Sequence, residues 1–196
     1  MSKFTVKDIA YMAIIAALAF VSFNYLKIDI PVGGDKTSLH FSNVFVVLGA
    51  LLLGGFKGGF ASAVGLTLAD LTTGYAHVAP RTFFLKMGIA LITGYFAHRV
   101  GKINAISVKP RIRLWVFIAS SLGMLFNVIF DPLVGYFYSI YILGVHVEPA
   151  ALLAKYAAGV TLINAVVTVI LASSFYLALR DVFRRANPEK FERRDY

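Results

Sequence analysis

Long apolar runs separated by short polar stretches dominate the pattern along this chain. A helix that crosses a membrane needs about 20 mainly apolar residues. Runs near this length recur through the sequence, and we interpret them as six membrane-spanning helices at roughly 8–25, 42–56, 58–76, 81–100, 112–136 and 150–180. The pattern therefore predicts an all-α integral membrane protein, a six-transmembrane-helix bundle that forms one domain over residues 1–196.

The segment between the first two apolar runs follows a different pattern. Residues 25–41, YLKIDIPVGGDKTSLHF, alternate apolar and polar side chains around Asp29 and then contain Pro31 and two glycines. Alternation is typical of a strand, whereas proline and glycine mark turns. We therefore expect an ordered outer loop or a short hairpin here rather than a spanning helix.

The distribution of positive charge predicts the orientation. Membrane proteins concentrate Lys and Arg in their cytoplasmic loops. With the N-terminus in the cytoplasm, fourteen of the 19 basic residues fall on that side, including the basic C-terminal segment 180–196. We interpret this segment as a solvated or headgroup-bound helix end. The expected location is the bacterial cell membrane, as a multi-pass protein with both termini cytoplasmic.

Composition agrees with this assignment and removes several function classes. The chain is 59% hydrophobic and 15% charged, whereas soluble domains are about 45–50% apolar and about 25% charged. It has no cysteine, so disulfides and thiolate sites are impossible. It lacks the nucleotide-binding, zinc-protease and serine-nucleophile motifs, and its four histidines are isolated, so we predict no metal site. The net charge of +9 is assigned to cytoplasmic loops rather than to nucleic-acid binding.

Small residues recur at a spacing of four. They include Ala13 and Ala17 in the first run and the glycines of the GGFKGG stretch at 54–59. This spacing places both members of a pair on one helix face and lets another backbone approach closely. Two interpretations stay open for the alanines: packing inside the bundle, or contact with a partner subunit.

Polar side chains gather toward the predicted outer side, most densely in residues 66–88, LTLADLTTGYAHVAPRTFFLKMG. A pore would need polar lining along its whole length, so this distribution predicts a cup open to the outside. A lone Asp70 inside a span costs several kcal/mol, and we expect a structural ion pair with Arg81 or Lys86. These two cations are five residues apart and point in different directions, so the other is free for an anionic substrate.

In their order along the chain, these segments resemble the S components of energy-coupling factor (ECF) vitamin transporters. The resemblance covers nearly the whole sequence and rests on Ala13-x-x-x-Ala17, the IPVGG loop, LGALLLGGFKGG and ADLTTGYAHVAPRTFFLKMG. The last stretch is similar to the branch with pantothenate, hydroxymethylpyrimidine or pyridoxine-type, and riboflavin-like substrates.

The resemblance implies a high-affinity binding subunit of an ECF-type ABC importer, not an enzyme. The subunit lies among membrane lipids, takes up a vitamin or precursor from outside and topples to deliver it. It docks on a transmembrane coupling subunit, and two cytoplasmic ATPases use ATP, so this chain itself needs no cofactor. Applied to this sequence, Ala13 and Ala17 dock the partner, and residues 27–41 form a lid. The substrate-binding residues are expected to be Lys36, His40, Tyr75, His77, Arg81, Lys86, Asn127, Asp131 and Asn164.

The vitamin is left open by the sequence. The cations slightly favour pantothenate, whose carboxylate suits a bidentate arginine, whereas aromatic residues suit pyridoxine or a pyrimidine. The alternative is a membrane-embedded lipid or isoprenoid enzyme using Asp70 and Asp131, although the chain lacks paired carboxylates at helical spacing. A purely structural subunit is disfavoured because charges inside a membrane usually serve function.

Overall fold

The computed structural model describes residues 4–32 and 34–191, and α-helices dominate this part of the chain. Its α-helices are α1 (Val6–Tyr25), α2 (Asn43–Leu53), α3 (Gly55–Thr72), α4 (Ala79–Gly94), α5 (Lys109–Tyr141) and α6 (Val147–Ala186). The strands are β1 (Lys27–Val32) and β2 (Asp35–His40). Short helical turns complete the fold: η1 (Ala76–Val78), a π-helical η2 (Tyr95–Val100) and η3 (Pro188–Lys190).

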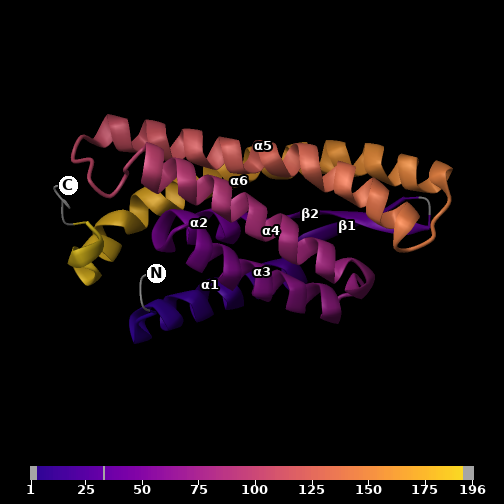
Figure 1. The fold of residues 1–196 in the computed structure, drawn as a ribbon, viewed down its shortest axis with the longest axis horizontal. Coiled ribbons are helices and arrows are strands. Elements are labelled where there is room, and N and C mark those ends of the chain that lie inside the picture. Colours follow the sequence, from indigo (N-terminus) through magenta and orange to yellow (C-terminus); the bar gives the residue numbers. More distant parts are fainter. Residues whose placement is uncertain (1–3, 33, 192–196) are drawn as a thin grey trace.

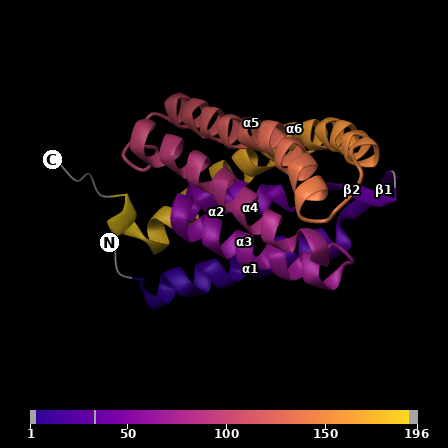
Figure 2. The same cartoon turned by 45° about the vertical axis from the view of Figure 1, so that its right-hand side comes forward.

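The helices form an elongated bundle (Figure 1). The two longest, α5 and α6, run side by side along one edge, and α1 lies along the opposite edge (Figures 1 and 2). Helices α2, α3 and α4 fill the space between them. The described parts of both chain ends lie at one end of the bundle, and the strands extend toward the other.

The predicted all-helical architecture is confirmed, with six described α-helices close to the predicted ranges. Three of them, α1, α5 and α6, are long and apolar enough to cross a membrane. The 11 residues of α2 reach only about 16 Å at 1.5 Å per residue, roughly half of a ~30 Å hydrocarbon core. Six complete spans therefore remain a prediction.

The segment 25–41 contains a hairpin. Strands β1 and β2 pair antiparallel, with Lys27 opposite His40 and Val32 opposite Asp35. This result agrees with the alternation around Asp29 and with the turn residues that follow it. Helix α6 packs against β2, so the hairpin folds back onto the bundle instead of extending away from it.

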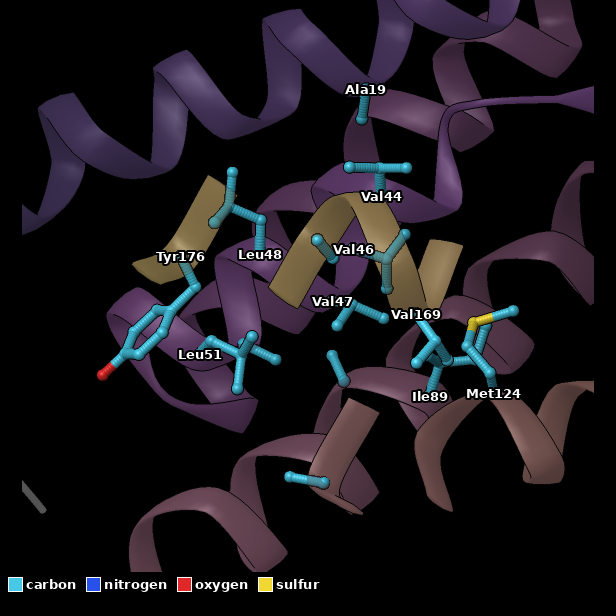
Figure 3. Close-up of a cluster of buried hydrophobic side chains, with 14 of the residues drawn as sticks. Ala19, Val44, Val46, Val47, Leu48, Leu51, Ile89, Met124, Val169 and Tyr176 are labelled. Carbon is cyan, nitrogen blue, oxygen red and sulfur yellow. The ribbon is translucent and has the colours of Figure 1, made fainter. Parts of the chain in front are cut away.

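The core is built around the short helix α2. Its side chains are buried along most of its length, and they meet residues from α1, α4, α5 and α6 (Figure 3). Val46, Val47 and Leu51 are fully buried there. An apolar helix buried on nearly every face belongs in the centre of a bundle, because no face needs to meet water or lipid.

Glycines bring the helix backbones into direct contact. A Cβ atom at Gly58 would overlap the backbone of Gly49, and one at Gly65 would overlap the backbone of Ala16. Three glycines of the GGFKGG stretch, Gly55, Gly58 and Gly59, therefore pack internally, whereas a Cβ atom at Gly54 would meet no atom within 4 Å. Ala13 and Ala17 differ, because both are exposed on the outer surface of α1. The structure thus separates two sets of small residues that the sequence pattern treats alike.

The end of the bundle that carries both chain ends is fastened by one buried carboxylate. Asp8 accepts hydrogen bonds from Lys57 Nζ at 2.6 Å and from Lys190 Nζ at 2.7 Å. It also forms a capping box with Thr5 at the start of α1. Lys190 thus joins the C-terminal segment to the bundle, while the interpretation of this segment as a solvated or headgroup-bound helix end stays a prediction. Residues 192–196 lie outside the described part.

Candidate substrate-binding site

A polar cavity lies between the hairpin and helices α3 to α6, at the end of the bundle away from the described chain ends. Its lining includes all nine residues that the sequence assigns to substrate binding, together with Asp70. Those nine come from β2, η1 and its flank, α4, α5 and α6. The structure therefore brings them together around one space, although their contact with a substrate remains a prediction.

Asp29 of β1 is the main anchor of the hairpin. Its carboxylate accepts hydrogen bonds from Ser38 Oγ at 2.7 Å, Tyr75 OH at 3.0 Å and Lys36 Nζ at 3.2 Å. Burial raises the pKa of Asp29, but these three hydrogen bonds and the nearby Lys27 outweigh it and hold the pKa below its ordinary value. Asp29 therefore stays ionised and ties β1 to β2 and to the α3–α4 connection.

Asn164 of α6 holds the other strand. Its Oδ1 accepts the backbone N–H of His40 at 3.1 Å, and its Nδ2 donates to the carbonyl of Ser38 at 2.9 Å. Both ends of the amide are thus bound to the backbone of β2. The structure gives Asn164 a role in fastening the hairpin over the cavity.

Two more of the expected binding residues contact the rim of the cavity. Lys36 donates to the carbonyl of Thr73 at 3.3 Å, and His77 Nε2 lies 3.4 Å from Oδ2 of Asp35. These contacts join the hairpin to the segment between α3 and α4. Part of the predicted binding set therefore closes the cavity in this structure.

His40 is a partly exposed, neutral member of the cavity wall. Its Nδ1 lies 2.7 Å from Ser42 Oγ, and its ring packs edge-on against Phe23. Burial, together with the positive charges of Lys86 and Lys27, lowers the pKa of His40 to about 3. The imidazole can therefore offer hydrogen bonds to a ligand but carries no charge near neutral pH.

Tyr75 presents little free ring surface. Lys27 Nζ and Lys36 Nζ lie 4.5 and 4.3 Å from its ring centroid, and Phe23 meets it edge-on. Its hydroxyl hydrogen-bonds to Asp29 and lies 2.5 Å from Ser38 Oγ. The contacts of Tyr75 are therefore made mainly with the hairpin and Phe23. Tyr75 lines the cavity, but its ring is not free to stack on a ligand.

The charged residues deeper in the cavity are not directly paired. Within residues 4–32 and 34–191, no carboxylate lies within 4.0 Å of a nitrogen of Arg81 or Lys86. The expected ion pair of Asp70 with one of these cations is therefore absent, which corrects the prediction. Asp70 lies in the last turn of α3, its carbonyl accepts the backbone N–H groups of Thr73 and Tyr75, and its side chain lines the cavity.

A second carboxylate, partly exposed, also lines the cavity. Asp131 of α5 accepts a hydrogen bond from Thr161 Oγ1 of α6 at 3.0 Å. Asn127, one turn earlier on α5, is buried, and its Oδ1 has no hydrogen-bond partner among the described residues. Acceptors that are buried without a partner are costly, so this wall is suited to a ligand that donates hydrogen bonds.

The position of Arg81 depends on a glycine. A Cβ atom at Gly135 of α5 would lie 2.5 Å from Nη1 of Arg81. The absence of a side chain at this position leaves the space that the guanidinium occupies. The Nε of Arg81 is buried without a hydrogen-bond partner in the described structure, so the group retains unused donor capacity.

The fold and the cavity together define a class: a membrane-embedded helical bundle with a polar cavity closed by a hairpin at one end. The family model described as ECF-type riboflavin transporter, S component, matches residues 3–181. This chain therefore belongs to that family, which confirms the assignment to the ECF S components; the branch of vitamin substrates stays a prediction. Because the family is one of transporters, the lipid or isoprenoid enzyme based on Asp70 and Asp131 is set aside.

Similarity to individual proteins adds little about function. A protein from Pyrococcus woesei, described as an uncharacterized protein in gap 3'region, is 34% identical over 77 residues. The match covers 39% of this chain and 51% of that protein, so the chain spans about half the length of this relative. No solved structure matches the chain.

Proposed function

We propose that this chain is the high-affinity substrate-binding subunit of an ECF-type ABC importer, with a water-soluble vitamin or precursor as its substrate and pantothenate favoured. The observation that carries the choice of substrate is the pair of cavity cations, Arg81 and Lys86, which have no carboxylate within ion-pair distance in the described residues. Cations are expensive inside a membrane protein, so a ligand that neutralises them gains affinity.

Pantothenate has the complementary chemistry. It carries one carboxylate, which Arg81 can bind through two parallel N–H groups with Lys86 as an additional cation. It also carries hydroxyl and amide donors, which match the acceptors Asn127 and Asp131 on α5. Riboflavin is the second candidate, because the family description names it. A flavin ring gains most from stacking, however, and the faces of Tyr75 are covered by two lysines.

The hairpin acts as the lid in this proposal. Asp29, Asn164 and Lys36 hold it closed over the cavity, and release of these contacts opens the path for the substrate. Because these contacts are individually modest hydrogen bonds, the lid can open without unfolding the bundle.

The partners are a transmembrane coupling subunit and two cytoplasmic ATPases, which use ATP; this chain takes no part in ATP chemistry. The coupling subunit docks on α1, where Ala13 and Ala17 are exposed. Small exposed residues allow close helix contact in a membrane, and this supports docking over internal packing. In this proposal both termini lie in the cytoplasm, because fourteen of the 19 Lys and Arg residues fall on that side of the predicted spans.

Direct binding to the purified chain tests the proposal. Isothermal titration with pantothenate, riboflavin and pyridoxine, together with mass spectrometry of the co-purified small molecule, identifies the substrate. Saturable one-to-one binding of pantothenate supports the proposal. Tight binding of riboflavin alone replaces pantothenate by the second candidate, and absence of any vitamin binding contradicts the binding role itself.

A further inference from the structure

A second hollow lies at the other end of the molecule from the substrate cavity. It is a groove between the α2–α3 junction and the C-terminal part of α4 with η2. Its walls are mainly apolar and include Leu53, Phe56 and Leu91. The basic side chains Lys57, Arg99 and Lys190 also line it. Nothing in the substrate-binding proposal uses this groove.

The floor of the groove is rigid. A Cβ atom at Gly94 would overlap the backbone of Gly55, so the two helices touch directly beneath it. One wall is the π-helical turn Tyr95–Val100. Such turns are rare and occur frequently at functional sites. His98 in this turn donates from Nε2 to the carbonyl of Ala50 at 3.1 Å, which fixes the wall to α2.

The groove carries an excess of positive charge. Lys57 and Lys190 share the single carboxylate of Asp8, at 2.6 and 2.7 Å. Arg99 is exposed, and no acidic side chain in the described ranges lies within 4.0 Å of it. Three cations therefore face the groove with one counter-charge, and Arg99 is the one available for an external anion.

We propose that this groove binds an anionic phospholipid, with the phosphate on Arg99 and the start of an acyl chain along the apolar wall. A basic pocket between helices on the cytoplasmic side of a membrane protein suits an anionic headgroup. The apolar wall at Phe56 and Leu91 can contact the acyl chain of a lipid, whereas a soluble anion has no hydrocarbon to place there. Phe56 is 60% exposed, so its ring is accessible to a lipid chain.

Native mass spectrometry of the full chain tests the site. The protein is equilibrated with equal amounts of phosphatidylglycerol and phosphatidylcholine of the same acyl composition, and the retained lipids are counted. We expect the wild type to retain one phosphatidylglycerol with a preference of about fivefold, the contribution of roughly one basic side chain at a membrane surface. Arg99→Gln should remove that preference, and Phe56→Ala should lower retention of both lipids.

Matched controls separate this site from general attraction to the basic end of the molecule. Arg111→Gln removes another exposed arginine, at the start of α5, and should leave the preference unchanged. An unchanged preference in Arg99→Gln overturns the proposal. Displacement of the lipid by inorganic phosphate alone assigns the site to a soluble anion instead, and displacement by the coupling subunit assigns the groove to a protein; either result also overturns the lipid proposal.

Discussion

The two ends of this bundle differ in whether their charged side chains are paired with an opposite charge. At the end that carries the chain termini, Asp8 is bound by Lys57 and Lys190 and by the cap of its own helix. At the cavity end, Arg81 and Lys86 have no carboxylate within 4.0 Å in the described structure. A charge that is paired inside the protein holds the fold together, whereas a charge left without a partner in a cavity is available to a ligand.

The largest effect is expected from breaking the paired end. Asp8→Asn leaves Lys57 and Lys190 without a counter-charge, and we expect a loss of about 3 kcal/mol in the free energy of unfolding. Thermal unfolding in detergent measures it, and substrate affinity should be unchanged. Asp181→Asn is the matched control, because its carboxylate is 60% exposed and should contribute under about 1 kcal/mol. Equal effects of the two variants would contradict the structural role of Asp8.

The next effect concerns the hairpin over the cavity. Asn164→Ala removes both hydrogen bonds to β2 and leaves a buried carbonyl and N–H unpaired, so the hairpin should be destabilised by about 2 kcal/mol. Hydrogen exchange of the hairpin amides measures this opening. Asn127→Ala also removes a buried amide from the cavity, but that amide makes no described hydrogen bond to the hairpin and should leave exchange unchanged.

Gly135→Ala tests whether the position of Arg81 matters for substrate binding. The new methyl group would collide with the guanidinium of Arg81, which must move, and pantothenate affinity should fall about tenfold, or 1.4 kcal/mol. Gly159→Ala is a suitable control, because a Cβ atom there has no atom within 4 Å. Calorimetric titration of both variants measures the difference. Retained affinity in Gly135→Ala would show that the position of Arg81 is unimportant for binding.

An effect of similar size is a pH dependence of the hairpin. The pKa of His40 is 6.5 when the hairpin is open. In the closed hairpin it falls to about 3, because burial and the positive charges of Lys86 and Lys27 outweigh the attraction of Asp29. Protons therefore bind the open form more strongly, so closed-hairpin stability is complete above pH 6.5 and falls below it. Between pH 7.5 and 5.5 the opening should become about tenfold easier. The pKa of Asp29 is also lowered in the closed hairpin, so protonation of its carboxylate reduces the stability of the closed form only in more acidic solution.

The test of this pH dependence is hydrogen exchange of the hairpin, corrected for the intrinsic effect of pH. His40→Gln cannot take up a proton and should lose the dependence. A wild-type hairpin whose opening is constant across this range would contradict the assignment of His40 as neutral in the closed hairpin.

Much of the fold could be predicted from the pattern of apolar and polar residues along the sequence. Apolar runs located the helices, because a long apolar segment must be helical in a membrane. Alternation and turn residues located the hairpin. The short length of α2 was harder to predict from the sequence, because its burial in the centre of the bundle depends on packing against helices from the whole chain. The outward position of Ala13 and Ala17 likewise depends on which face of α1 meets α3.

The candidate site was predictable as a set of residues but not as a set of roles. Polar residues in an apolar chain stand out, which is why the expected residues meet around one cavity. Asn164 looked equally suited to a ligand and to a neighbouring helix, and it binds the hairpin backbone instead. Asp29 was visible only as part of an alternating strand, and Gly135 carried no signal, because its importance arises from a side chain on another helix.

In the proposed function, Arg81 binds the carboxylate of a vitamin inside this cavity. Calorimetric titration of pantothenate into the wild type, Arg81→Gln and the exposed-site control Arg111→Gln tests it most directly. A charge-assisted hydrogen bond contributes about 1.5–3 kcal/mol, so Arg81→Gln should bind about 10–100-fold more weakly while Arg111→Gln binds like the wild type. Equal affinity of all three proteins for pantothenate would contradict the account.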